Sequence, residues 1–389
     1  MNWIFFLSRF GINPDRKTKN SLYLQGKWLY HQRELHLQAN HFLKNIVALL
    51  FWGYCFSDKK MIAWARRNLK QQLDEQFTDS GYHYEFVPTY HVLSINDILD
   101  CYNLIKNNII VFDNKLKQEV QKVLYRGLAS LDQLSINGQW IPVADVNYQD
   151  CPGKEQTLNY AEKIAIEEDK FDKIQHKYFP AIRTNKVKIM IVNTPFSPAY
   201  NPGHSHQDKL SVMLWYANKP VLIDPGNYTY EDNQMRYYTR SVNAHNTIKI
   251  DNLEQAETWS SFRLGYRGKV LNNKLSDNKI NISYLHKKYK HTRILKKTKN
   301  ILIIKDIIQS PGDHSYKQFF HFNPDLDLDR KNKTIIVNNS LKFSFYQSAS
   351  LQNSWYFPEM YRKIKNTCAI VEGDFTDSCQ VITEVIPLS

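Results

Sequence analysis

The hydrophobic periodicity of this 389-residue chain changes near Lys186, and that change restricts the fold more than any other feature. Before it, apolar residues recur at helical spacing and predict helices at His36–Phe56, Lys59–Phe77, Ser94–Lys106 and Asn114–Leu134. After it, ten or more short apolar or alternating segments are separated by Asn, Asp, Gly and Lys turns. The sequence therefore predicts an α+β protein, with an array or toroid of helical hairpins over 1–172 and a large antiparallel β-sandwich over 173–389.

The charge balance narrows the class of partner. Lysine and arginine outnumber the acidic residues, for a formal net charge of +13, so the protein should attract a polyanion. No helix-turn-helix, zinc finger or RNP signature accompanies the charge, which argues against nucleic acid. No apolar run reaches the length of a transmembrane segment, and no signal peptide is evident. The five scattered cysteines predict no disulfide framework. We expect a cytoplasmic location, or a periplasmic one if the N-terminus is incomplete.

The stretch Asn201–Thr247 concentrates side chains suited to chemistry around two short apolar runs. The runs, Leu210–Tyr216 and Pro220–Ile223, are predicted to pair as strands. His204 and His206 are two residues apart, so in an extended segment their side chains leave the same face.

Two further residues stand at predicted strand ends. Asp224 follows an apolar run and precedes a Pro-Gly turn, and His245 opens the next alternating strand. These two side chains and His206 could meet, and two imidazoles with one carboxylate suit Zn²⁺ with a fourth position left to water. The alternative is that the His-x-His pair caps a strand and Asp224 is an ordinary turn residue.

Several motifs, in a fixed order, resemble those of the heparinase II/III-like polysaccharide lyases. They are GHSHQD from Gly203, LIDPGNYTY from Leu222, RSVNAHNT from Arg240, NHFLKNIVALL from Asn40, and GYHYEFVPTYH ending at His91. The helical half is shorter than a complete toroid of that family. The resemblance therefore implies a short member with an incomplete toroid, whose groove is open or is completed by another chain in a homo-oligomer.

The resemblance also implies roles in β-elimination from a 4-linked uronic acid. Asn40 would hold the substrate carboxylate, with His204 beside it. Tyr90 would protonate the departing O4 and, for a syn geometry, would also remove the C5 proton. His41 is the candidate base for the opposite epimer. Stabilising the carboxylate as C5 loses its proton is the task of an oxyanion hole, and the proton transfers are general acid and base catalysis.

The same resemblance assigns His206, Asp224 and His245 as ligands of a structural zinc ion. The metal would fix the ends of the strands and hold His204 in place.

Substrate-binding candidates lie between Asp224 and His245. The planar guanidinium of Arg240 suits a carboxylate or sulfate, and Arg236 and Tyr237 precede it in the same segment. For Arg236 the alternative is a surface ion pair with Glu231 or Asp232.

The catalytic candidates have structural alternatives as well. Asn40 and His41 stand at the start of a predicted helix and could cap it. Tyr90 follows Pro88 and could be a packing tyrosine. His321, in an aromatic strand, is interpreted as a core histidine.

The favoured function is a zinc-containing lyase acting on an anionic, uronate-containing polysaccharide. One alternative is a non-catalytic or biosynthetic protein that binds or trims a bacterial surface polysaccharide. Another is a zinc-dependent glycan hydrolase, for which Asp208 is the nearest candidate for a general base.

Overall fold

The structure is a computed structural model, and it describes residues 7, 10–107, 112–149, 151–166, 171 and 177–388. The chain divides into two compact units, which we describe separately. Unit 1 comprises residues 1–85, 89–132 and 151–175, and unit 2 comprises residues 86–88, 133–150 and 176–389. The domain boundary predicted at residues 172 and 173 falls on positions outside the described residues.

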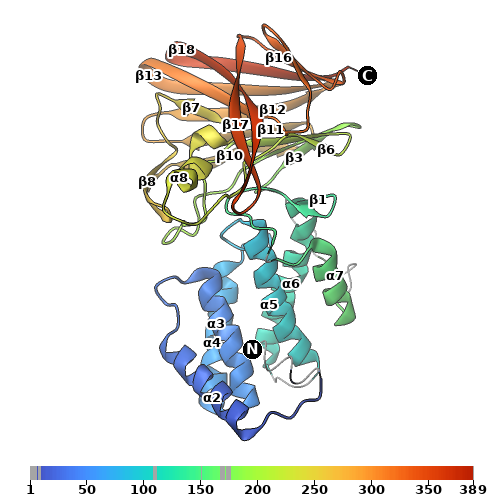
Figure 1. The fold of residues 1–389 in the computed structure, drawn as a ribbon, viewed down its shortest axis with the longest axis vertical. Helices are drawn as coiled ribbons and strands as arrows, with labels where there is room; N and C mark the ends of the chain where they lie inside the picture. The colour runs from blue at the N-terminus through green and yellow to red at the C-terminus, as the bar shows by residue number, and fades with distance from the viewer. Residues whose placement is uncertain are drawn as a thin grey trace. The chain divides into compact units, whose positions relative to one another are not determined.

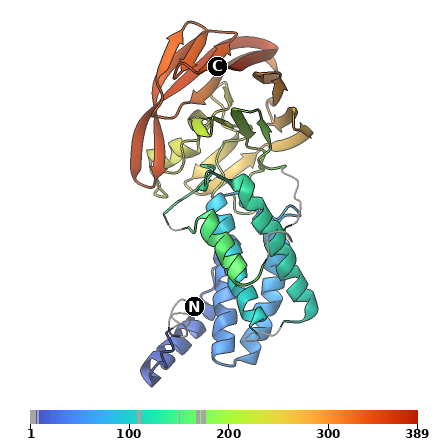
Figure 2. The same ribbon diagram turned by 90° about the vertical axis from the view of Figure 1, so that its right-hand side faces the viewer.

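Unit 1 is built from helices. Their bounds are α2 Arg16–His31, α3 Ala39–Cys55, α4 Lys59–Gln76, α5 Pro88–Lys106, α6 Asn114–Leu134 and α7 Lys154–Lys163. Leu43, Ile46 and Leu50 of α3 are fully buried, as the helical spacing of its apolar residues predicts. A short turn separates α3 from α4. In this turn the carboxylate of Asp58 caps α4 by accepting from the backbone N–H of Met61 at 3.0 Å. Helices α3 and α4 remain adjacent in both views (Figures 1 and 2).

One helix begins earlier than the sequence predicts. The helix ending at Lys106 was predicted to begin at Ser94, but α5 already begins at Pro88 and Ser94 is buried inside it. Proline is favoured in the first turn of a helix, where its missing N–H has no intrahelical partner to lose. The early start places Tyr90 in the first turn of α5.

Unit 2 is built from antiparallel sheets. A large sheet has the strand order β10-β11-β12-β13-β18-β16-β15-β14, with β7 also paired to β13 and β17 to β18. A second sheet has the order β3-β4-β5-β6, and β1-β2 and β8-β9 form two-stranded ribbons. The strands run β1 Ser135–Ile136, β2 Gln139–Trp140, β3 Ala181–Arg183, β4 Val187–Ile191, β5 Val212–Tyr216, β6 Lys219–Leu222, β7 Ile248–Ile250, β8 Ala256–Ser260, β9 Arg263–Arg267, β10 Lys269–Ser276, β11 Lys279–Leu285, β12 Lys290–Thr298, β13 Ile301–His321, β14 Leu328–Lys331, β15 Thr334–Val337, β16 Leu341–Phe345, β17 Ala349–Glu359 and β18 Arg362–Pro387.

The predicted sandwich is confirmed, and one apolar core joins its sheets. Leu214 of β5 is buried in the same cluster as Ile304 of β13 and Phe343 of β16. The predicted pairing of the two runs in Asn201–Thr247 is also confirmed, since Leu214 of β5 pairs with Leu222 of β6.

Two strands are longer than predicted. The apolar segments ILIIKDI and YKQFFHF, which look like two strands in the sequence, form the single strand β13, and TCAIVEG and SCQVITEVI likewise form the single strand β18. These two long strands pair with each other along most of their lengths, as Figure 1 shows, with a register shift between Gln309 and Asp313. Pro311 and Gly312 therefore mark an irregularity within a strand instead of a turn that ends it.

Within the part of the chain that the structure describes, no helix is both long enough and apolar enough to cross a membrane. None of the five cysteines, all of them described, is paired in a disulfide.

Candidate active site

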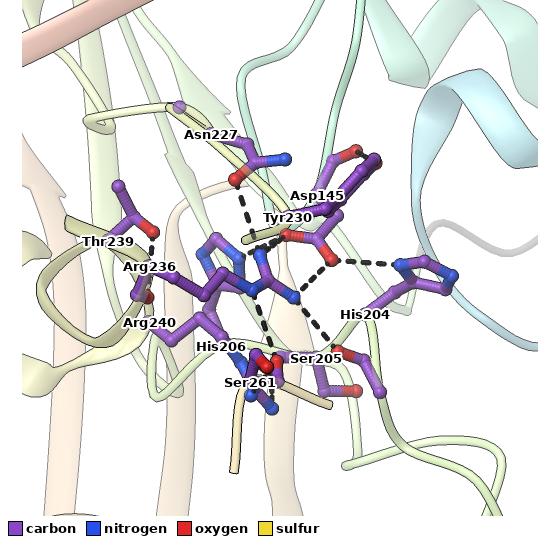
Figure 3. A network of polar contacts seen from close by, with 12 residues as sticks. Asp145, His204, Ser205, His206, Asn227, Tyr230, Arg236, Thr239, Arg240 and Ser261 are labelled. Carbon is purple, nitrogen blue, oxygen red and sulfur yellow. Dashed lines mark hydrogen bonds and ion pairs between the residues drawn. The ribbon is translucent and has the colours of Figure 1, made fainter. Parts of the chain in front are cut away.

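A buried carboxylate joins two of the predicted site histidines. Asp145 lies in the loop after β2, and Figure 3 shows its side chain between His204, His206 and the guanidinium of Arg236. Nδ1 of His204 is 2.8 Å from Oδ2 of Asp145, and Nε2 of His206 is 2.8 Å from Oδ1. Arg236 approaches both oxygens, with Nη2 at 2.7 Å from Oδ2 and Nη1 in contact with Oδ1. One carboxylate therefore serves both histidines and one arginine.

Local structure positions the arginine. Arg236 belongs to the short helix α8, Gln234–Arg240, whose cap is Asn233. The side-chain oxygen of Asn233 accepts from the backbone N–H of Arg236 at 3.1 Å. The guanidinium also donates to the carbonyl oxygens of Ser261, at 3.1 Å, and Gly203, at 3.2 Å. These bonds fix the plane of the fork that faces Asp145.

The charges in this network are well defined. Burial alone would raise the pKa of Asp145, but the charge of Arg236 and the hydrogen bonds of the two histidines hold that pKa well below its usual range. The carboxylate is therefore ionised and can only accept hydrogen bonds. It follows that the ring nitrogen of each histidine that faces Asp145 carries a hydrogen.

The two histidines differ in exposure. His206 is fully buried, and this burial lowers its pKa to about 4, so its ring is neutral near pH 7. The side chain of His204 is 16% exposed, and its ring lies edge-on to Tyr230 and Phe262, with centroids 6.0 Å apart in each case. Of the two rings on Asp145, only His204 is accessible to a solute.

A second cluster adjoins the buried side of His206. The rings of His206 and His245 lie with their centroids 5.5 Å apart. Nδ1 of His245 is 2.8 Å from Oδ2 of Asp224, which opposes the effect of burial and raises the pKa of His245. Nδ1 of His206 and Nε2 of His245 are both buried and have no hydrogen-bond partner among the described residues.

These two nitrogens bear on the predicted metal site. Across residues 7, 10–107, 112–149, 151–166, 171 and 177–388, no group of three or more His, Cys, Asp or Glu side chains is arranged to hold a metal ion. The structure does place His206 beside His245, and His245 beside Asp224. Two unpartnered imidazole nitrogens are the donor type that Zn²⁺ accepts.

The remaining catalytic candidates lie in unit 1. Asn40 and His41 occupy the first turn of α3, after Gln38, the N-cap residue, whose φ is 57°. Nδ1 of His41 is 3.2 Å from a carboxylate oxygen of Glu34, and the other oxygen of Glu34 accepts from Nδ2 of Asn45 at 2.8 Å. The His41 side chain is 44% exposed, so a carboxylate orients it without covering it. The alternative that His41 caps the helix is not what the structure shows.

A buried polar network holds the backbone next to Asn40. The side-chain oxygen of Asn40 is buried and has no hydrogen-bond partner among the residues that the structure describes. Gln76 donates to the carbonyl of the preceding residue, Ala39, at 2.8 Å, and contacts Nε2 of His83 at 2.9 Å. This network holds the backbone at the start of α3, where Asn40 is the second helical residue and therefore not its cap.

Tyr90 is partly buried in the first turn of α5, next to the fully buried His91. Nδ1 of His91 accepts from the backbone N–H of His83 at 3.1 Å, and Nε2 is 3.0 Å from the carbonyl oxygen of Gly127. Burial lowers the pKa of His91 to about 4, so this neutral histidine belongs to the core of unit 1.

The arginine predictions need correction. Arg236 and Arg240 were predicted to contact substrate, but both are buried, and Arg236 pairs with Asp145 instead of forming a surface pair with Glu231 or Asp232. Arg240 donates to the backbone carbonyls of Ser260, at 3.1 Å, and Ser205, at 3.4 Å. Both guanidiniums therefore bond, from the buried side, to the backbone of residues 203–208, which carry His204 and His206 and are called the histidine loop below. Of the three predicted binding residues, only Tyr237 is exposed.

Two residues of these networks were missed by the sequence analysis. Asp145 ends the run Ile141-Pro-Val-Ala, the same pattern of an apolar run followed by aspartate that drew attention to Asp224. Glu34, which orients His41, stands in a polar segment without any distinguishing signal.

Two family models match most of this chain. A family model described as heparinase II/III-like, C-terminal, matches residues 171–383, and one described as heparinase II/III N-terminus matches residues 16–139. No curated protein matches the sequence.

Several solved structures share the fold. A heparan sulfate lyase, HepC, from Pedobacter heparinus is 15% identical with a TM-score of 0.70, covering 95% of this chain and 63% of that one. A heparinase III is 13% identical with a TM-score of 0.70, covering 90% of this chain and 61% of that one. A chondroitinase AC lyase is 9% identical with a TM-score of 0.50, covering 90% and 61%. The chain thus spans less than two thirds of the length of these proteins.

Proposed function

Since this chain belongs to the heparinase II/III-like family, we propose that it is a polysaccharide lyase that cleaves a uronic-acid-containing, anionic polysaccharide by β-elimination. The observation that carries the proposal is the arrangement at Asp145. A buried, ionised carboxylate holds the partly exposed His204 through Nδ1, which is 2.8 Å away. The net charge of +13 supports an anionic polymer as substrate, because a basic protein raises the local concentration of a polyanion.

The elimination needs groups of three kinds. A base removes the C5 proton of the uronic acid, donors stabilise the negative charge that develops on the neighbouring carboxylate, and an acid protonates O4 as the C4–O4 bond breaks. In our proposal Asn40 and His204 hold the carboxylate, and Tyr90 transfers the proton from C5 to O4 in a syn elimination. Asn40 and Tyr90 each lie in the first turn of a helix, the end at which the helix dipole favours negative charge.

His41 would serve as the base for the opposite C5 epimer. Glu34 lies 3.2 Å from Nδ1 of His41 and turns Nε2 away from itself, so Nε2 is the nitrogen that would receive the proton. In this geometry Tyr90 would act only as the acid on O4.

We also propose that His206, Asp224 and His245 hold a zinc ion. Nδ1 of His206 and Nε2 of His245 support this, because they are buried and have no partner among the described residues. In the structure Asp224 is bonded to Nδ1 of His245, on the far side of that ring from Nε2, so Asp224 would have to exchange this bond to bind the metal itself. When bound, the ion would supply structural fixation of the strand ends, and the protein's own residues would carry out the proton transfers.

The hydrolase alternative has less support. Asp208, its candidate base, lies 2.5 Å from Nζ of Lys209, and each of these side chains is only 2% exposed. A carboxylate that is buried and paired in this way cannot readily take a proton from water. A protein that only binds a surface polysaccharide remains as the outcome that the following experiment separates from a lyase.

The test is ultraviolet absorbance during incubation with uronate polymers, including heparan sulfate, hyaluronan, alginate and bacterial capsules. Elimination leaves a conjugated C4–C5 double bond that absorbs, whereas hydrolysis leaves none. We expect a rise with at least one polymer, and we expect Tyr90→Phe to abolish it while folding stays intact. Binding without any rise would contradict the proposal, and so would an undiminished rise with Tyr90→Phe.

A further inference from the structure

Asp145 stands outside every motif that resembles the family, yet it contacts both histidines of the GHSHQD segment. It is 59 residues from His204 and 61 from His206 in sequence, and 91 from Arg236. The fold therefore brings a distant carboxylate to the histidine loop and buries it completely. An isolated buried charge is costly, so such a group persists where it is paired and fully hydrogen-bonded.

Each oxygen of Asp145 has its own pair of partners (Figure 3). Oδ1 receives Nη1 of Arg236 and Nε2 of His206, and Oδ2 receives Nη2 of Arg236 and Nδ1 of His204. The bidentate guanidinium holds the carboxylate in one orientation, and each histidine then meets a defined oxygen. The arrangement is the same on the two oxygens, but the two rings use different nitrogens.

This difference determines where the ring hydrogens lie. An ionised carboxylate beside an arginine only accepts, so His204 must carry its hydrogen on Nδ1 and His206 on Nε2. The ring nitrogen without hydrogen is therefore Nε2 in His204 and Nδ1 in His206, and the two nitrogens face different surroundings. Nε2 of His204 is turned away from Asp145 on the one partly exposed ring, and Nδ1 of His206 keeps a lone pair beside His245.

We propose that Asp145 is a positioning residue that sets opposite tautomers in His204 and His206, with Arg236 holding it in place. His204 thereby presents Nε2 to the substrate, and His206 presents Nδ1 to the interior of unit 2. The consequence for catalysis rests on the lyase function proposed above, whereas the tautomers do not depend on it.

The direct test is nuclear magnetic resonance of protein labelled with ¹⁵N at histidine. Two-bond ¹⁵N–¹H correlations distinguish rings with hydrogen on Nδ1 from rings with hydrogen on Nε2. Spectra of His204→Gln and His206→Gln assign the two rings. In the wild-type protein near pH 8, we expect His204 as the Nδ1–H form and His206 as the Nε2–H form. The reverse assignment of either ring would overturn the proposal.

The matched perturbation is Asp145→Asn. An amide has one accepting oxygen and one donating nitrogen, so it can satisfy only one of the two rings in its present tautomer. At least one ring should therefore change tautomer. Because Asp145→Asn leaves Arg236 buried without its counter-charge and could prevent folding, the double variant Asp145→Asn/Arg236→Gln, which removes both charges, is measured as well. A folded variant with both rings unchanged would overturn the proposal.

The chain contains a suitable control in Asp306. It is fully buried, and it pairs with Nε of Arg293 at 2.7 Å and with Nε2 of His291 at 2.6 Å. Asp306→Asn breaks the same kind of triad at a carboxylate whose partners are His291, Arg293 and Gln318, although Arg293 also donates to the backbone carbonyls of Leu210 and Asn246. We expect it to leave the tautomers of His204 and His206 as in the wild type, and a change in those rings would show that the effect of Asp145→Asn is not specific.

Activity gives a second readout. If His204 acts as proposed, the folded double variant should lose about 10- to 100-fold in kcat, the range typical for removing the partner that orients a site histidine, with little change in KM. An unchanged kcat would refute the positioning role in catalysis. If the wild-type protein shows no elimination with any polymer, the proposed function fails while the tautomer measurement still decides the role of Asp145.

Discussion

Replacing Arg236 by glutamine should destabilise unit 2 strongly. The guanidinium is fully buried, contacts both oxygens of Asp145 and donates to backbone carbonyls of Gly203 and Ser261 at 3.2 and 3.1 Å. Glutamine is too short and has too few donors to replace these bonds. Asp145 would then be a buried charge without its counter-ion, and its pKa would rise because Arg236 is the largest influence that lowers it.

The magnitude follows from the burial of both partners. Removing one member of a fully buried ion pair costs about 3–5 kcal/mol. In a domain of this size, each kcal/mol lowers the melting temperature by about 2–4 °C, so the expected decrease is roughly 6–20 °C. Because two units need not unfold together, hydrogen exchange of strand amides in unit 2 should be measured alongside the thermal transition.

The matched control is Arg66→Gln. Arg66 donates to Asp113 at 2.8 Å, but the two side chains are 30% and 62% exposed. Water replaces a lost partner at such a site, so the melting temperature should stay nearly unchanged. Equal decreases for the two variants, or a decrease of less than about 3 °C for Arg236→Gln, would refute the argument from burial.

Three further predictions concern metal, pH and backbone. His206→Ala should lose bound zinc and thermal stability together, measured by elemental analysis and calorimetry; retained metal would contradict the ligand assignment. The pKa of His91 is about 4 in the folded state and about 6.5 when unfolded, so about 3 kcal/mol of stability present above pH 6.5 is lost as the pH falls toward 4. In His91→Gln the midpoint of denaturant unfolding should therefore change less with pH between 6.5 and 4 than it does in the wild type. Gly81→Ala should destabilise far more than Gly138→Ala, because both have φ of 78° but only at Gly81 would the added carbon approach Arg126 backbone, at 2.4 Å; equal midpoints would contradict this.

Much of the fold could be predicted because its signals are local. The pairing of β5 with β6 follows from alternation on either side of a short turn, and α6 has the predicted bounds Asn114–Leu134. The errors arise where pairing with a distant strand outweighs a local turn signal. Pro311 looks like the end of a strand, but β13 continues past it because β18 pairs with the segments on both sides.

In the candidate site, too, some residues could be found from local sequence signals and others could not. His206, Asp224 and His245 could be grouped from sequence because each stands at the end of a predicted strand. The substrate-binding role of Arg236 was wrong because residue type alone does not reveal burial, and its partner Asp145 is 91 residues away. A carboxylate that pairs with such a distant arginine leaves no spacing pattern for a sequence reader to detect.

His204 and His206 were expected to share one face of an extended segment, but residues 203–208 form a turn and irregular chain, in which both rings nevertheless reach the same carboxylate. They reach it through different nitrogens, so one ring is left with Nε2 and the other with Nδ1. The shared carboxylate of Asp145 therefore produces two chemically different histidines in one loop. A partly exposed site residue and a buried residue beside His245 are thus held by one carboxylate, so we expect a change at Asp145 to affect both.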